Sequence, residues 1–173
     1  MKKAISILCI IVTFFTLYFL QANFFSWFTI SGIKPNLFII FTLFLGLFTA
    51  KKMGAIFGLI FGLYLDLLIG KSIGISGIML GAVGLLGEYF DKNFSKESRV
   101  TIMLMVIGST ILYEAGSYFF NIINMEITVE IITFIKILFI EVIYNTIIVI
   151  ILYPLIQRAG YTLENIFSLK NIF

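Results

Sequence analysis

The chain has 173 residues, of which 61% are hydrophobic and only 12% are charged. A soluble globular domain is about 45–50% apolar and about 25% charged, so this composition excludes an ordinary soluble protein. The apolar residues are enough to fill roughly five membrane helices of about 20 residues each. We therefore predict a polytopic, all-α membrane protein.

Two absences restrict the chemistry. The sequence has no His and a single Cys, Cys9, which excludes His-based catalysis, His-ligated metals and disulfides within the chain. We expect no enzyme activity, no cofactor and no metal site. The net charge of +3 is interpreted as an orientation signal and not as a nucleic-acid-binding surface.

Six apolar runs follow one another along the chain. The first, residues 4–20, is interpreted as an uncleaved membrane helix, because no cleavage site follows it and further spans do. The other spans are predicted at residues 35–50, 53–70, 72–90, 100–123 and 131–153. Pro35 suits the first turn of the second helix, and Pro154 is expected to end the sixth. Residues 1–173 are predicted to form one integral membrane domain.

The basic residues predict the orientation of these spans. Most of the 12 Lys and Arg residues fall on the side of the N-terminus, and only Lys34 and Lys71 fall on the other side. Short cytoplasmic loops collect Lys and Arg. Both termini are therefore predicted to lie in the cytoplasm.

Small residues recur at steps of four in and after the third span. This strip consists of Gly54, Gly58, Gly62, Asp66, Gly70 and Gly74. Positions four apart share one helix face, and glycine lets a neighbouring backbone approach closely. The strip could pack against helices of the same chain or against a helix of another subunit.

Four charged side chains fall inside the predicted spans: Asp66, Glu114, Lys136 and Glu141. The helix rise places the first three at a similar depth, and an unpaired charge there is costly. We therefore expect Lys136 to approach Asp66 or Glu114. Asn145, one turn beyond Glu141, is its expected hydrogen-bond partner. The cluster suits a structural pair, a partner or ligand site, or a proton or ion relay.

The second and third spans also carry a recognisable pattern. Lys34-Pro35-Asn36-Leu37 opens the second span, the glycine strip follows in the third, and Gln21 comes after the first span. This pattern resembles the bacterial rod shape-determining protein MreD family, and the size and the number of spans agree with it.

The resemblance implies a non-catalytic membrane component of the rod complex, the machinery that elongates the lateral cell wall, in the inner membrane. Its implied main partner is MreC, bound through a transmembrane helix. MreB, RodA and a penicillin-binding transpeptidase are further implied partners. Membrane lipid and a second copy of the chain are also expected to bind.

The family's implied fold is similar to that of the substrate-binding component of energy-coupling-factor transporters. This similarity supplies the alternative function, binding of a vitamin in an outward-facing pocket. Such a pocket would be lined by Asp66, Glu114, Tyr113, Tyr118, Asn121 and Lys136.

Overall fold

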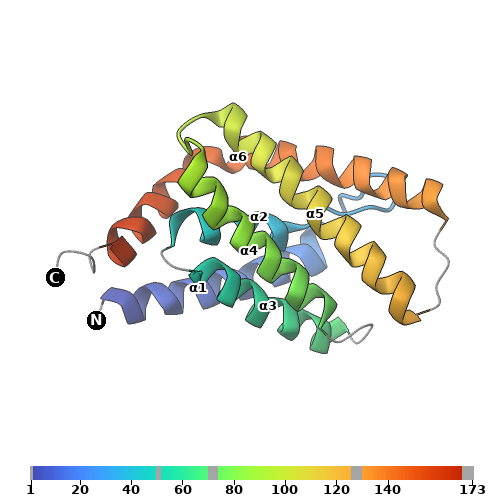
Figure 1. The fold of residues 1–173 in the computed structure, drawn as a ribbon, viewed down its shortest axis with the longest axis horizontal. Helices are drawn as coiled ribbons and strands as arrows, with labels where there is room; N and C mark the ends of the chain where they lie inside the picture. The colour runs from blue at the N-terminus through green and yellow to red at the C-terminus, as the bar shows by residue number, and fades with distance from the viewer. Residues whose placement is uncertain (1, 50–51, 70–73, 126–129, 169–173) are drawn as a thin grey trace.

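The computed structural model describes residues 2–49, 52–69, 74–125 and 130–168 (Figure 1). These residues form six α-helices and one short π-helix, with no strand in the described ranges, which confirms the all-α prediction. The elements are α1 (Lys2–Phe19), η1 (Leu20–Phe24), α2 (Leu37–Phe48), α3 (Met53–Ile69), α4 (Ile75–Asn93), α5 (Arg99–Met125) and α6 (Ile131–Ser168).

The helices differ in their capacity to cross a membrane. Among the described residues, three stretches are long and apolar enough to do so, Lys3–Phe24, Arg99–Ile123 and Ile131–Phe167. Leu37–Phe48 and Met53–Leu68 are shorter apolar helices. The 12 residues of α2 extend over about 18 Å, well below the hydrocarbon thickness of about 30 Å. The ends of α2 must therefore be satisfied by other parts of the protein.

The last helix is longer than the sequence predicts. α6 runs through Pro154 to Ser168, so the prediction that Pro154 ends it was wrong. Proline removes one helical hydrogen bond, but contacts on both sides hold this segment in place. The Tyr153 hydroxyl donates to the Glu97 carbonyl at 2.7 Å, and the Tyr161 ring packs edge-on against Phe48.

Helices α2, α3 and α4 pack backbone against backbone. A Cβ added to Gly58 of α3 would lie 2.4 Å from the Leu80 carbonyl oxygen of α4. A Cβ added to Gly46 of α2 would lie 2.3 Å from the Gly84 carbonyl oxygen, also of α4. Real Cβ atoms do not approach other atoms so closely, so these contacts require glycine. The three helices form one tightly packed unit.

α2 lies in the interior of the bundle (Figure 1). Every one of its residues except Phe41 is buried, because α3, α4, α5 and α6 surround it and α1 contacts it as well. On the outside of this unit, Phe14 of α1 stacks on Phe61 of α3 with 4.2 Å between ring centroids. The start of α1 and the end of α6 lie at the same end of the molecule (Figure 1).

A lysine in the connection between α4 and α5 ties three helices together at that end. The Lys96 Nζ lies 2.6 Å from Asp91 Oδ1 and 2.9 Å from Glu164 Oε1 of α6. It also donates to the Leu47 carbonyl of α2 at 3.3 Å. Burial disfavours the charged form of Lys96, but its hydrogen bonds to Asp91 and Glu164 outweigh burial, and its pKa is raised above the usual value.

Replacing this lysine should destabilise the bundle. Lys96→Met would leave both carboxylates without their partner, and we expect the free energy of unfolding to fall by about 1–2 kcal/mol. Thermal unfolding of the purified protein in detergent measures this. Lys92→Met is the matched control, because Lys92 is 67% exposed and binds only Glu88; its effect should stay below about 0.5 kcal/mol. Equal effects of the two variants would contradict the role of Lys96.

The glycine contacts give a second prediction with a control in the same pair of helices. Gly58→Ala forces α3 and α4 apart, and we expect a loss of about 1–3 kcal/mol in unfolding free energy. In Gly81→Ala the new Cβ would meet its nearest atom at 3.6 Å, so this variant should be neutral or up to about 1 kcal/mol more stable. The same unfolding measurement tests both, and a tolerated Gly58→Ala would refute the close packing.

Candidate functional site

The glycine strip is used inside the chain. Added Cβ atoms on Gly54, Gly58 and Gly62 would collide with backbone atoms of α2 or α4. A partner helix cannot contact these three glycines while α2 and α4 are in place, so the structure favours packing within the chain over partner docking here. Gly70 lies outside the described residues. Gly74 has a φ of +102° directly before α4, a conformation that glycine adopts readily.

Asp66, on the same face of α3, caps the N-terminus of α4. Its Oδ2 accepts hydrogen bonds from the backbone N–H groups of Gly74 at 2.8 Å, Ser76 at 3.1 Å and Gly77 at 3.4 Å. The first N–H groups of a helix have no partner within the helix, and the helix dipole favours a negative charge at this end. The buried carboxylate therefore has its partner in the backbone.

The expected ion pair of Lys136 was wrong. Among the described residues, salt bridges involve only Lys92 and Lys96, and Lys136 is exposed on the outside of α6. Counting residues predicts the position of Lys136 along its helix but not the direction in which its side chain points.

A second cap holds the N-terminus of α2. The Asn36 N–H donates to Asn145 Oδ1 of α6 at 2.8 Å, and the Leu37 N–H donates to Gln21 Oε1 of η1 at 2.9 Å. Asn145 also donates from Nδ2 to the Thr110 hydroxyl of α5 at 3.1 Å. Pro35 has no N–H, so Asn36 and Leu37 carry the first free donors. The Gln21 and Pro35-Asn36-Leu37 positions of the sequence pattern thus meet in one buried cap.

Two carboxyl groups lie beside this cap. Glu141 of α6 interacts electrostatically with Glu114 of α5, and Asn145 and Asn36 lie next to it, so the pairing of Glu141 with Asn145 stays a prediction. The buried Glu141 Oε1 and Asn36 Oδ1 accept no hydrogen bond from any described residue.

The two caps are connected through α5. Tyr113 of α5 lies beside Ser76, whose backbone N–H binds Asp66. Tyr113 also interacts electrostatically with Glu114, Glu141 and Asp66. Three of the four residues of the predicted charged cluster thus belong to one polar network, and Lys136 does not. Sequence reasoning missed Thr110, because a lone threonine in an apolar span gives no signal of its own.

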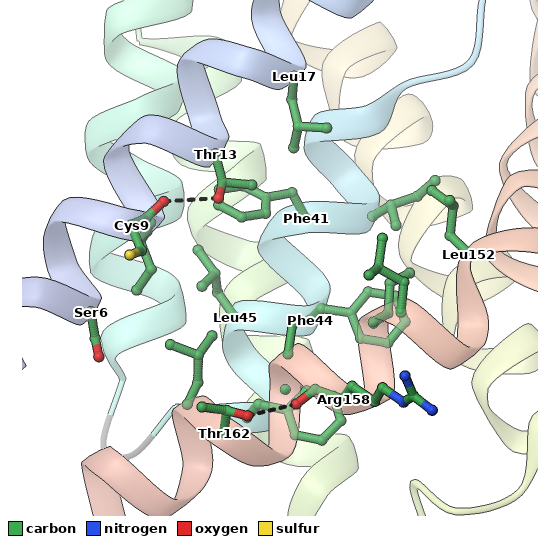
Figure 2. A pocket seen from close by; sticks show the side chains of 18 of the residues that line it. Ser6, Cys9, Thr13, Leu17, Phe41, Phe44, Leu45, Leu152, Arg158 and Thr162 are labelled. Carbon is green, nitrogen blue, oxygen red and sulfur yellow. Dashed lines mark hydrogen bonds between the residues drawn. The ribbon is translucent and has the colours of Figure 1, made fainter.

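The large cavity of the molecule lies elsewhere. It measures about 700 Å³ and is enclosed by α1, α2 and α6 (Figure 2). None of the residues predicted to line a vitamin pocket lines this cavity. The geometry therefore gives no support to the vitamin-binding alternative.

The α2 cap can be tested by replacing Asn145. Asn145→Leu removes the acceptor of the Asn36 N–H and leaves that group unsatisfied in an apolar interior, so we expect a loss of about 1–3 kcal/mol in unfolding free energy. Asn23→Leu is the control, because exposed Asn23 binds only the Phe19 carbonyl of its own turn; its effect should stay within about 0.5 kcal/mol. Thermal unfolding in detergent compares the two, and a stable Asn145→Leu variant would refute the cap.

Comparison with known proteins identifies the family. A family model described as rod shape-determining protein MreD matches residues 1–158. No curated protein and no solved structure matches the chain. The matched range contains both helix caps, and the apolar helices agree with a multi-pass protein of the inner membrane. The chain belongs to the MreD family, whose role is in rod shape determination.

Proposed function

We propose that this protein is a non-catalytic membrane scaffold of the rod complex, which holds MreC by transmembrane helix packing and so supports cell shape and lateral peptidoglycan synthesis. The family match over residues 1–158 carries this proposal. The scaffold is one integral membrane domain with both termini in the cytoplasm. MreB, RodA and a penicillin-binding transpeptidase are its further proposed partners, directly or through MreC.

Basic residues at the end of the molecule where α1 starts and α6 ends support the proposed orientation in the membrane. Four basic residues of the described ranges lie in or next to the α2–α3 and α4–α5 connections: Lys52, Lys92, Lys96 and Arg99. The two connections lie close to each other, because the Lys52 N–H donates to Glu88 near the end of α4. Lys96 also binds Glu164 near the end of α6. Basic residues gathered at one end favour the cytoplasmic side.

The outer face of α3 is the proposed surface for MreC. The glycine side of α3 is fixed against α2 and α4, whereas Ile56, Ile60, Leu63 and Leu67 form a stripe on the opposite side that is 36–68% exposed. These positions follow the three- and four-residue spacing of one helix face. Helices associate in lipid partly through van der Waals packing of their faces. This stripe replaces the glycine strip as the proposed docking surface.

Photocrosslinking in cells tests this assignment. We expect a photoreactive phenylalanine analogue placed at Leu67 to crosslink to MreC, because Leu67 is on the stripe and 68% exposed. Ile151 of α6 has the same exposure, 68%, and is the matched control that should give little MreC product. The products are identified by mass spectrometry.

Equal MreC products from both positions, or products only from Ile151, would contradict the proposed surface. Absence of MreC from products at every exposed position of α1, α3, α5 and α6 would contradict the scaffold function itself.

A further inference from the structure

The cavity between α1, α2 and α6 is a groove with an apolar interior. Its walls come from the three helices, as Figure 2 shows. Representative lining residues are Cys9 and Thr13 of α1, Phe41 and Leu45 of α2, and Leu155 and Arg158 of α6. Its volume of about 700 Å³ lies within the range of about 300–1,000 Å³ typical of small-molecule sites.

The two threonines that line the groove are hydrogen-bonded within their own helices. The Thr13 hydroxyl donates to the Cys9 carbonyl at 2.8 Å, and the Thr162 hydroxyl donates to the Arg158 carbonyl at 2.8 Å (Figure 2). Each threonine therefore offers its methyl group and not a free donor. An occupant of the interior must be an apolar chain, because a polar ligand would lose its hydrogen bonds to water without replacement.

One edge of the groove carries a positive charge without a counterion. Arg158 is exposed and forms no ion pair with any described residue. The nearest carboxylate along α6, Glu164, is occupied by Lys96. On the opposite wall, Lys3 lies in the first turn of α1, which continues into the groove-lining Ile5 and Ser6.

The edge of the groove that carries Arg158 lies at the end of the bundle where the α4–α5 connection lies. Tyr153, about one turn before Arg158, binds the Glu97 carbonyl in the α4–α5 connection. The groove extends from this end to Leu17 and Leu37, deeper in the bundle. A molecule with an anionic head at Arg158 and an apolar tail along α2 matches both regions.

We propose that the groove binds one anionic phospholipid, with an acyl chain between α1 and α6 and the phosphate on Arg158. Arginine at the cytoplasmic boundary of a helix bundle is a characteristic partner of anionic lipid head groups. A transmembrane helix is about 10–12 Å wide and fits less well, because Phe14 of α1 already contacts Phe38 of α2 with 5.4 Å between ring centroids. A helix would have to push α1 away. The proposal does not depend on MreC binding.

Native mass spectrometry of the purified full-length protein, titrated with phosphatidylglycerol, tests the tail site. The wild type should retain one phosphatidylglycerol. Thr13→Phe fills the groove from α1 and Leu155→Trp fills it from α6, and both should abolish that adduct. Val12→Phe is the matched control, because Val12 is 56% exposed and does not line the groove; it should bind as the wild type does.

The binding of the lipid head group to Arg158 is tested with a second lipid, phosphatidylethanolamine, and with a variant that lacks the positive charge. Arg158→Gln should weaken phosphatidylglycerol binding roughly fivefold, the effect of one basic residue at an anionic lipid. It should weaken phosphatidylethanolamine binding less, because the ammonium group of that lipid offsets the charge of its phosphate. Lys92→Gln removes one charge from the same end and should have no effect. Thermal unfolding confirms that each variant is folded.

Three results would overturn the proposal. The first is equal lipid binding by Thr13→Phe and Val12→Phe. The second is wild-type binding of phosphatidylglycerol that is no tighter than that of phosphatidylethanolamine and that is unchanged in Arg158→Gln. The third is a polypeptide, either a second copy or another membrane protein, crosslinked through Cys9 in place of bound lipid.

Discussion

The structure depends on supplying hydrogen-bond acceptors to helix ends that are buried in an apolar bundle. Water cannot reach such ends in a membrane, so every free N–H must be bound by the protein. α2 is too short to cross the bilayer, and its first N–H groups bind Asn145 and Gln21. The first N–H groups of α4 bind Asp66. Buried Asp66 and Asn145, together with half-buried Gln21, therefore bind the first N–H groups of helices.

The caps and the glycines act together. Asp66 fixes where α4 begins after α3, and Gly58 and Gly62 then let the two backbones run in contact from that point. Tyr113 of α5 lies beside Ser76 of α4 and brings α5 next to the same cap. α1 is held differently, through aromatic contacts such as Phe14 on Phe61. The bundle thus combines a rigid unit of α2, α3 and α4 with an outer helix that leaves a groove beside it.

The sequence predicts the helices well and their mutual orientation poorly. Apolar runs gave six helices whose positions agree with the structure within a few residues, apart from the extension of α6 to Ser168. That extension depends on contacts with Lys96 and Phe48, which are distant in sequence and leave no local signal.

Four-residue glycine spacing indicates close packing but not which helix packs there. The error at Lys136 has a related cause, since depth along a helix follows from counting residues whereas facing direction requires the neighbours. The partners of Asp66 are backbone N–H groups, which every residue type except proline carries and which therefore leave no pattern in the sequence.

The distribution of polar groups argues for a protein that works through its surfaces. The carboxylate of Asp66 and the amides of Gln21 and Asn145 are engaged with helix ends, and Glu114 and Glu141 are engaged with each other. The proposed helix-binding stripe on α3 and the proposed lipid groove with Arg158 at its edge are built from different helices. If both proposals hold, a helix and a lipid can be bound at the same time without competing for one surface.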